Sequence, residues 1–404
     1  MTMRPFTSTI SLDEARRRLD AAVVPISRIE RVPLAEAAGR VVAADVRSEL
    51  DVPPFGRSSM DGYAVVASDV AGASRATPVH LRIVERLYTG RMAREAIASG
   101  ACAEIATGAP LPAGADAVIP VEDTAKDGEN GVAIFAAVTA GRHVGRRGSD
   151  IQAGADVVRR GDLLTPSRIG ALAAIGRTEV DAYARPRVAV LSTGNEVVEP
   201  GRPLQPGQIY DVNRFTLAAI VAAHGGSPEP HAAADDSLEA LTMALDGCAT
   251  ADVIVFSGGS SVGERDLVRD VVSARGEMIF HGIAVKPGKP TAFAKLGTQA
   301  FFGMPGNPTS CLSNAYVLLI PFLRATARLP PFMPRRLRVP LGRRIVSTAG
   351  RHQFYTVRLT DGVALPAFKG SGDITSLSQA DGYIEIAPDQ SVVEQGTEVE
   401  VTLF

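Results

Sequence analysis

One stretch of the sequence, residues 253–266, joins a predicted strand to a predicted helix through a glycine-rich loop. Its first four residues form a short apolar, β-branched run that indicates a buried strand, and the apolar spacing after residue 266 indicates one face of a helix. Three glycines and several serines between them let the backbone turn tightly and expose N–H groups that bind an anion such as phosphate. The stretch therefore predicts a sheet covered by helices, with chemistry in the loop.

Glu264 and Asp266 add negative charge to this loop. Carboxylates repel phosphate unless a divalent cation lies between them, and Mg²⁺ commonly binds proteins through one or two carboxylates plus substrate phosphates. We therefore interpret the loop as a site for a metal-bridged phosphorylated ligand. The alternative is a solvated turn that needs glycine only for its geometry.

Predicted strands and helices alternate between residues 187 and 327. The strands are expected at 188–192, 253–257, 278–285 and 300–303, and the helices at 213–223, where Asn213 serves as the cap, at 237–245 and at 309–327. Such alternation predicts an α/β fold with a parallel sheet covered on both faces. Ligand loops are then expected at the carboxyl ends of the strands.

The remaining regions show other patterns. A capping pattern at Ser11 predicts an N-terminal helix, and a second helical segment is expected at 34–42. Short β-type runs fill residues 53–145, and a helix at 167–175 is expected to pack beside the N-terminal one, which leaves the β region as an insertion. After the proline-rich residues 330–334, short strands and a hairpin signal at 360–363 predict a closed β unit.

Composition excludes several classes of function. The net charge of −2 argues against nucleic-acid binding and against polybasic binding to membranes. The three cysteines are far apart, and neither they nor the six histidines follow a metal-binding spacing. The longest apolar stretch, residues 315–323, is too short to span a bilayer. We therefore expect a cytoplasmic protein that binds neither nucleic acid nor membrane.

Further polar loops follow the other predicted strands. Residues 192–196 offer hydroxyls, a glycine and the carboxylate of Glu196, while Lys286 and Lys289, held by neighbouring prolines, form a cationic clamp for an oxyanion. Residues 304–310 open a helix at its anion-attracting end. Each loop alone fits a solvated turn or a helix entry equally well, but their shared position at one sheet edge favours a ligand site.

Six motifs occur along the chain in a fixed order. They are Pro-Pro-Phe with Ser-Met-Asp-Gly-Tyr-Ala (53–64), Ala-Thr-Gly-Ala-Pro-Leu-Pro (106–112), Leu-Ser-Thr-Gly-Asn-Glu (191–196), Ser-Gly-Gly-Ser-Ser-Val-Gly-Glu-Arg-Asp (257–266), Lys-Pro-Gly-Lys-Pro (286–290) and Gly-Met-Pro-Gly-Asn-Pro (303–308). Together they resemble the molybdopterin molybdenumtransferase family, the MoeA type that includes the E domain of gephyrin. The resemblance covers residues 8–404.

The resemblance implies a subunit of four parts. These are a discontinuous N-terminal linker domain (1–52 and 146–184), an inserted β domain (53–145), an α/β molybdopterin-binding domain (185–329) and a C-terminal β barrel (330–404). It also implies a homodimer whose active site is shared between subunits, with transient contacts to the molybdopterin adenylyltransferase and to acceptor molybdoenzymes.

The activity implied by the resemblance is the insertion of molybdate into molybdopterin. In the family's reaction, adenylyl-molybdopterin is hydrolysed in a Mg²⁺-dependent step and molybdate enters the dithiolene, which gives molybdenum cofactor and AMP. Tungstate has nearly the same size and charge as molybdate, so both oxyanions are candidates. Two other functions stay open: the related adenylyltransferase activity and a non-catalytic scaffold.

The family's functional positions carry over by motif. Catalytic roles are implied for Asp61, Asp150, Glu196, Asp236 and Asp266, with Glu196 and Asp266 as the metal ligands. Binding roles are implied for Thr107, Ser192, Thr193, Gly194, Gly258, Gly259, Ser260, Lys286, Lys289, Pro305, Gly306, Asn307, Ser310, Arg351 and Ser371. Many relatives have basic residues where this chain has Gly282 and Thr356, so either Arg351 or Arg358 could complete the oxyanion pocket.

Overall fold

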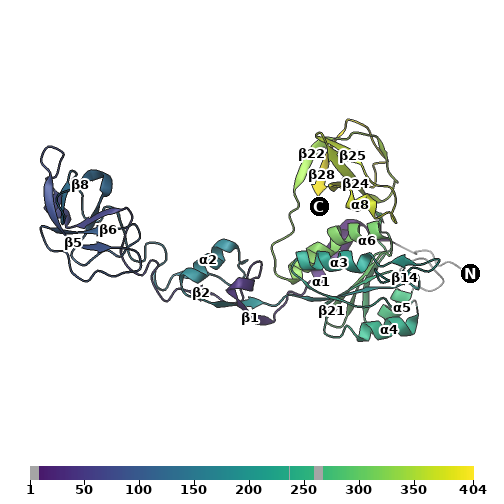
Figure 1. The fold of residues 1–404 in the computed structure, drawn as a ribbon. Helices are drawn as coiled ribbons and strands as arrows, with labels where there is room; N and C mark the ends of the chain where they lie inside the picture. The colour runs from purple at the N-terminus through teal and green to yellow at the C-terminus, as the bar shows by residue number, and fades with distance from the viewer. Residues whose placement is uncertain (1–8, 236, 259–266) are drawn as a thin grey trace, which may run out of the picture. The chain divides into compact units, whose positions relative to one another are not determined.

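The computed structural model describes residues 9–235, 237–258 and 267–404 of the chain, and these form two units (Figure 1). Unit 1 comprises the N-terminal segment to Glu30, Gly39–Val41 and Tyr183–Phe404. Unit 2 comprises Arg31–Ala38 and Val42–Ala182. The two units are described separately below.

A six-stranded sheet forms the centre of unit 1. Its strands, in spatial order, are β16 (Ser227–Pro230), β13 (Arg187–Ser192), β17 (Val253–Ser257), β21 (Gln299–Met304), β20 (Ala292–Leu296) and β18 (Glu277–His281). The first four run parallel, which confirms the predicted α/β class. The sequence analysis did not predict β20, which runs antiparallel to both neighbours because only Gly297 and Thr298 separate it from β21.

Helices cover both faces of this sheet. One face packs against α1 (Leu12–Ala22), α3 (Asn213–Ala223), α6 (Pro308–Asn314), a π-helical turn (Ala315–Leu319) and α7 (Ile320–Thr326). The other face packs against α4 (Leu238–Asp246) and α5 (Leu267–Arg275) (Figure 1). In β17, Val253 and Val255 belong to the first core and Ile254 and Phe256 to the second. Successive side chains of this strand therefore pack on opposite faces of the sheet, and both faces are apolar.

The predicted strand at 278–285 is divided in the structure. Gly282 has a φ of +95°, and after this break the chain forms β19 (Val285–Lys286), which leaves the central sheet. β19 instead pairs in parallel with β24 (His352–Thr360) of the C-terminal region. The prediction of one continuous strand is therefore wrong, and the lysine loop connects two sheets.

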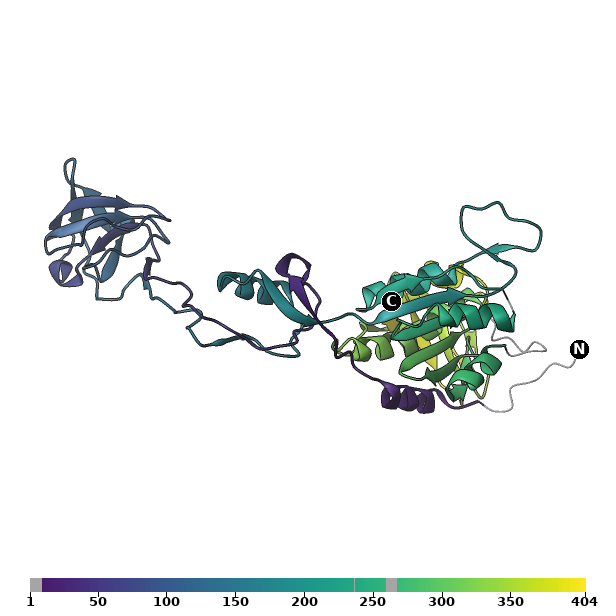
Figure 2. The same ribbon diagram turned by 90° about the horizontal axis from the view of Figure 1, so that it is seen from below.

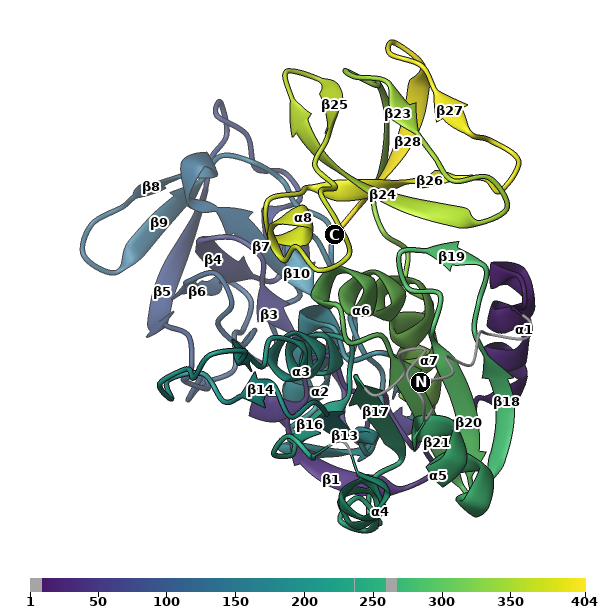
Figure 3. The ribbon, with the colours of Figure 1, turned by 90° about the vertical axis from the view of Figure 1, so that its right-hand side faces the viewer.

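The C-terminal region is β-rich. Its main sheet has the strand order β19-β24-β26-β28-β22, in which β26 is Gly382–Ile386, β28 is Glu398–Leu403 and β22 is Arg336–Pro340. β25 (Val363–Pro366) pairs with β24, and β23 (Ile345–Val346) pairs with β27 (Val392–Val393). The region has one short helix, α8 (Thr375–Ser378), among its described residues. A bridge from Leu341 to Ala364 links the end of β22 to β25 and closes the ring (Figure 3). Asp361 and Gly362 both have positive φ, as the predicted hairpin turn requires.

Unit 2 contains a second six-stranded sheet, coloured blue in Figure 2. Its order is β7 (Ala117–Pro120), β4 (Gly62–Val65), β6 (Ala101–Ile105), β5 (Val79–Leu87), β9 (Gly131–Ile134) and β8 (Thr124–Lys126). Short ribbons pair β3 (Arg57–Ser58) with β10 (Val144–Gly145) and β2 (Val46–Arg47) with β11 (Asp156–Val158). Elsewhere β1 (Ile29–Pro33) pairs with β12 (Glu179–Tyr183), and β14 (Val197–Val198) with β15 (Ile209–Tyr210).

The helix predictions outside the central sheet had mixed outcomes. Ser11 caps α1 by accepting a hydrogen bond from the Glu14 N–H at 3.1 Å, as predicted. The helix expected at 34–42 is wrong, because only a 3₁₀ turn at Leu34–Glu36 forms before Gly39 adopts a φ of +74°. The helix at 167–175 is confirmed as α2 (Pro166–Ala174), which contributes to a core of unit 2, whereas α1 contributes to a core of unit 1.

The described helices and cysteines limit two further properties. No helix in the described ranges has the length and apolar character that a bilayer span requires. Cys102, Cys248 and Cys311 are buried as free thiols. Burial raises the pKa of Cys102 to about 12 and that of Cys248 to about 11, so both remain protonated at neutral pH.

Phe302 offers a test of the unit 1 core. Its fully buried ring lies edge-on to Phe293 and Phe322, with centroids 4.9 and 5.1 Å away. We expect Phe302→Ala to lower the free energy of unfolding by about 3–5 kcal/mol, because it removes buried apolar area and leaves a cavity. Urea denaturation followed by circular dichroism would measure this. Phe215→Ala is the control, because that ring is 52% exposed and its loss should change stability little.

Candidate active site

Three parallel strands of unit 1 end at the same level. Ser192 at the end of β13 pairs with Ser257 at the end of β17, and Ser257 pairs with Met304 at the end of β21. The loop after β16 reaches this level too, because Thr193 bridges to Ala234. The loops predicted to bind a ligand therefore leave the sheet at one edge.

The lysine loop begins at this edge as well. His281 at the end of β18 pairs with Ala292, and Ala292 pairs with Gly303, one residue before the end of β21. The connection that carries Lys286 and Lys289 thus starts and finishes on the side from which the other loops emerge. Four of the predicted residues, Asp236, Gly259, Ser260 and Asp266, lie outside the described ranges.

Two predicted glycines make close contacts that a side chain would prevent. Gly258 has a φ of +102°, and a Cβ there would lie 2.5 Å from the carbonyl oxygen of Thr193. Gly194 has a φ of +140°, and its Cβ would lie 2.7 Å from the carboxylate of Glu196. Gly258 therefore needs glycine for conformation and for space, whereas Gly194 needs it for conformation, because the flexible Glu196 side chain can move away. The exposed Glu196 carboxylate consequently lies against the backbone and forms no ion pair with any described residue.

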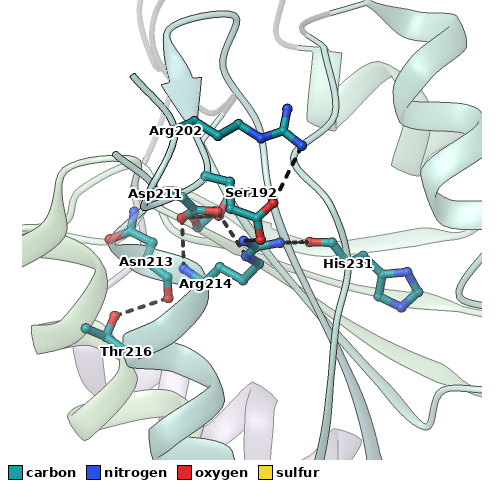
Figure 4. A network of polar contacts seen from close by, with 9 residues as sticks. Ser192, Arg202, Asp211, Asn213, Arg214, Thr216 and His231 are labelled. Atoms are coloured by element: carbon teal, nitrogen blue, oxygen red, sulfur yellow. Dashed lines mark hydrogen bonds and ion pairs between the residues drawn. The ribbon is translucent and has the colours of Figure 1, made fainter. Parts of the chain in front are cut away.

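A buried polar network lies beneath these loops (Figure 4). The Asp211 carboxylate, 4% exposed, accepts hydrogen bonds from the Ser192 hydroxyl at 2.9 Å and from the Arg214 backbone N–H at 3.1 Å. The Arg214 guanidinium lies 3.4 Å from the same carboxylate and donates to the His231 carbonyl at 3.1 Å and to Glu199 at 3.0 Å. The network therefore connects the exits of β13 and β16 to the start of α3.

Asn213 extends this network to a third loop. Its amide donates to the carbonyl oxygen of Gly306 at 2.7 Å, and so fixes the Pro305-Gly306-Asn307 turn. The prediction that Asn213 caps α3 is wrong, because Asn213 is the first helical residue and Asp211 accepts the N–H in the first turn. Since Asp211 accepts the first-turn N–H, the Asn213 amide is available for the Gly306 carbonyl.

Several hydrogen bonds hold the lysine loop in place. The Lys286 ammonium donates to the Thr348 hydroxyl at 2.7 Å, and the backbone carbonyl of Lys289 accepts from the Ile283 N–H at 2.9 Å. The buried Asn314 amide of α6 donates to the Gly288 carbonyl at 2.9 Å and to the Thr291 hydroxyl at 2.5 Å. The lysine loop is thus held to α6 by Asn314 and to the C-terminal region by Thr348.

The C-terminal region also contacts the start of α6. The Asn307 amide donates to the Ser371 hydroxyl at 3.2 Å, the Thr309 N–H donates to the Ser371 carbonyl at 3.1 Å, and the Thr309 hydroxyl donates to the Asp373 carbonyl at 2.8 Å. Ser310 is 3% exposed and Pro305 is buried at the same helix start. The predicted residues Asn307 and Ser371 are therefore direct neighbours.

The two candidate arginines of the C-terminal region lie at different places along β24. Arg351 directly precedes His352, which pairs with Val285 next to Lys286. Arg358 lies seven residues further along, or roughly 24 Å at about 3.4 Å per residue, and donates to the Gln379 carbonyl at 3.0 Å. Position therefore favours Arg351 as the residue near the lysine loop.

The remaining predicted residues belong to unit 2. One carboxylate oxygen of Asp61 accepts hydrogen bonds from the Thr107 backbone N–H at 2.6 Å and from its hydroxyl at 2.8 Å, and these bonds lower the pKa of Asp61. Asp150 is exposed, and its backbone N–H donates to the Val52 carbonyl at 3.0 Å. Asp61 and Thr107 are thus brought together, whereas Asp150 lies on a separate ribbon of the unit.

Comparison with known proteins identifies the family. Three family models match in order: the MoeA N-terminal region (domain I and II) at residues 10–176, a probable molybdopterin binding domain at 189–325, and the MoeA C-terminal region (domain IV) at 338–404. A molybdopterin molybdenumtransferase 2 of Mycobacterium tuberculosis is 36% identical over 96% of this chain and 98% of its own length. The chain belongs to the molybdopterin molybdenumtransferase family.

Other members agree in sequence and in fold. The molybdopterin molybdenumtransferase of Haemophilus influenzae is 32% identical over 98% of both chains. A crystal structure of a molybdopterin biosynthesis MoeA protein from Pyrococcus horikoshii superposes with a TM-score of 0.84 at 38% identity, covering 98% of this chain and 99% of that one. The relatives are named as enzymes, and this chain is a member of that enzyme family.

Sequence reasoning missed several residues that hold the predicted ones. Asp211 and Arg214 support the β13 loop, Asn314 supports the lysine loop, and Asp51 supports the ribbon that carries Asp150. The Asp51 carboxylate accepts from the Ala153 N–H at 2.9 Å and from Arg147 at 2.7 Å, which lowers its pKa. A signal did exist for Asp211, because an acid just before a predicted helix is a common cap.

We expect Asp211→Ala to lower the free energy of unfolding by about 3 kcal/mol, the lower end of the range for breaking a buried ion pair, because Glu199 still contacts Arg214. Chemical denaturation would measure the loss. Asp246→Ala is the control, since its ion pair with Arg275 is largely exposed and should contribute little. Equal stability of the two variants would contradict a supporting role for Asp211.

Proposed function

We propose that this enzyme inserts molybdate into molybdopterin by hydrolysing adenylyl-molybdopterin in a Mg²⁺-dependent reaction that releases AMP. Membership of the family supports the chemistry. The observation that carries the proposal is that the Glu196 loop and the lysine loop share one sheet edge. Ser192, Ser257 and Met304 align at the strand ends. Ala292, just after the lysine loop, pairs with Gly303 next to Met304. Carboxylates at this edge suit a metal that bridges to phosphate, and lysines at the same edge suit an oxyanion.

The two kinds of charge occupy different parts of this edge. Glu196 follows β13, whereas Lys286 and Lys289 lie beyond β21 and β20. Three inter-strand spacings separate β13 from β20, or roughly 14 Å at about 4.8 Å each. We therefore assign the adenylyl phosphates to the Glu196 side and molybdate to the lysine side, where ammonium groups favour a tetrahedral dianion.

The residues present fit a magnesium ion that is bound together with its substrate. The described ranges contain no group of three or more His, Cys, Asp or Glu side chains that could hold a metal by themselves. Mg²⁺ needs only one or two protein carboxylates when phosphates complete its octahedral shell. Glu196 and Asp266 would hold the ion, which when bound neutralises charge on the phosphates.

The assignment of the other residues completes the proposal. Ser192, Thr193, Gly194 and Gly258 would line the phosphate side with Gly259, Ser260 and Asp236, while Pro305, Gly306, Asn307, Ser310, Arg351 and Ser371 would line the oxyanion side. Asp61, Thr107 and Asp150 would serve the site across a homodimer. We also propose the four-domain division, the transient contacts with the adenylyltransferase and acceptor molybdoenzymes, and a cytoplasmic location.

Release of AMP tests this function. We expect the purified chain, given adenylyl-molybdopterin, Mg²⁺ and molybdate, to release AMP and form molybdenum cofactor, and to do neither when EDTA removes the metal. Chromatography of AMP and reconstitution of a molybdenum-free molybdoenzyme would measure the two products. Formation of adenylyl-molybdopterin from ATP would instead identify an adenylyltransferase, and binding without either reaction would identify a scaffold. A parallel titration with tungstate compares the two oxyanions.

The lysine loop gives a second test. We expect Lys286→Ala combined with Lys289→Ala to raise the molybdate concentration for half-maximal insertion by about tenfold or more, because two charge-assisted contacts to the oxyanion are lost. AMP release at saturating molybdate should change less. Lys295→Ala, at the opposite end of β20, is the matched control. An unchanged molybdate dependence in the double variant would remove these lysines from the oxyanion site.

A further inference from the structure

The lysine loop, which connects β18 to β20, packs against a buried side chain of α6. Asn314 is fully buried and donates to the Gly288 carbonyl at 2.9 Å and to the Thr291 hydroxyl at 2.5 Å. The Thr291 hydroxyl in turn donates to the Gly288 carbonyl at 2.9 Å. Gly288 lies between Lys286 and Lys289, so these bonds hold the part of the loop that carries both lysines.

The close approach of the loop to α6 depends on Gly288. Gly288 has a φ of +104°, which favours glycine, and a Cβ there would lie 2.2 Å from Nδ2 of Asn314. Pro287 and Gly288 are buried, whereas Lys286 and Lys289 are half-buried. The backbone of the loop therefore packs on α6 while both lysines keep access to solvent.

Backbone hydrogen bonds across the loop join its two arms. The Gly282 N–H donates to the Thr291 carbonyl at 2.9 Å, and the Ile283 N–H donates to the Lys289 carbonyl at 2.9 Å. Because these bonds tie the outgoing arm to the returning arm, a contact at Gly288 or Thr291 restrains the whole loop. The Asn314 amide therefore acts on the position of the lysines without touching the ligand.

The same face of α6 carries one of the residues proposed for the oxyanion side. Ser310 and Asn314 are four residues apart, so they lie one turn apart on the same side of the helix, about 6 Å along its axis at about 1.5 Å per residue. On the proposed function, Ser310 lines the oxyanion side together with Lys286 and Lys289. The contact between Asn314 and the loop therefore sets the separation between Ser310 and the lysines.

The Asn314 side chain is not arranged for stability alone. Its Oδ1 is buried and has no hydrogen-bond partner among the residues that the structure describes. A buried polar atom without a partner destabilises a fold, and an apolar side chain of similar shape would avoid that cost. Departures of this kind are expected at functional sites. What distinguishes Asn314 from a leucine at this position is its pair of donors to the lysine loop.

We propose that Asn314 is a positioning residue that fixes the width of the oxyanion site and makes the site selective for molybdate over the smaller sulfate dianion. The inference rests on the proposed function and extends it from the charge of the oxyanion to its size. Both anions are tetrahedral dianions, so the lysines attract them to a similar degree. A fixed separation between α6 and the lysine loop distinguishes them, because the larger anion contacts both sides at once.

Calorimetric titrations of molybdate, sulfate and tungstate into the full-length chain test the inference. We expect the wild-type chain to bind molybdate at least about tenfold more tightly than sulfate. Asn314→Leu matches the shape of the native side chain but has no donor. It should weaken molybdate binding by about tenfold and sulfate binding by less than about twofold, because the site loses its fixed width. The ratio of molybdate to tungstate affinity should stay constant, because these two anions have nearly the same size.

Thr326→Val is the matched control. The buried Thr326 hydroxyl donates to the Phe322 carbonyl at 2.9 Å within α7, so this variant also removes a buried hydrogen bond from unit 1, but it does so outside the lysine loop. Its affinities for all three anions should equal those of the wild-type chain.

A second variant guards against a folding defect in Asn314→Leu. Thr291→Val keeps Asn314 and removes the hydroxyl that contacts both Asn314 and Gly288, so it should lower the ratio of molybdate to sulfate affinity by about threefold. In the Lys286→Ala, Lys289→Ala background, Asn314→Leu should weaken molybdate binding by less than about twofold, because its effect passes through the lysines.

Three results would overturn the inference. The first is a ratio of molybdate to sulfate affinity that is unchanged in both Asn314→Leu and Thr291→Val. The second is an equal weakening of both anions in these variants, and the third is no binding of molybdate by the wild-type chain.

The outcome is separable from that of the proposed function. Selectivity that depends on Asn314, in a chain that releases no AMP from adenylyl-molybdopterin, would support the inference and reject the function. Normal AMP release and molybdate insertion, together with anion affinities that ignore Asn314, would reject the inference and leave the function intact. AMP release by Asn314→Leu at saturating molybdate should stay within about twofold of the wild-type rate, because the residue positions the oxyanion site and not the adenylyl phosphates.

Discussion

The parallel hydrogen-bonded ladder through β13, β17 and β21 is the constraint on which the rest of the site depends. Because every second residue faces the opposite side, Val188 and Val190 enter one core while Ala189 and Leu191 enter the other. A slip by one residue would exchange these faces, and both faces are buried, so the register is strongly specified. That register is what aligns Ser192, Ser257 and Met304 and makes their loops leave the sheet together.

The alignment of the strand ends does not by itself hold the loops in place. Buried polar groups provide the additional contacts. Asp211, Asn213 and Arg214 are each at most 8% exposed to solvent. Burial of charged groups is unfavourable unless hydrogen bonds within the protein replace those lost to water. Here the compensation comes from the loops themselves: the Ser192 hydroxyl and the His231 and Gly306 carbonyls. These contacts compensate the buried groups only in part, because one oxygen of Asp211 and Nε of Arg214 have no hydrogen-bond partner among the described residues. The contacts that do form fix the loops, which links the stability of the sheet edge to its geometry.

The sequence was informative where structure follows from local pattern. Apolar runs located β13, β17 and β21, and glycine-rich loops after them marked the ligand edge. The pattern failed where long-range partners decide. Residues 278–285 are mostly apolar, yet Gly282 ends one strand and the next pairs with β24, far along the chain. Asp211 and Asp51 were missed for the same reason, since their importance lies in the groups they contact. Of the predicted site, Lys286 and Lys289 were identified from their proline-held spacing, whereas Arg351 and Ser371 depended on motif recognition.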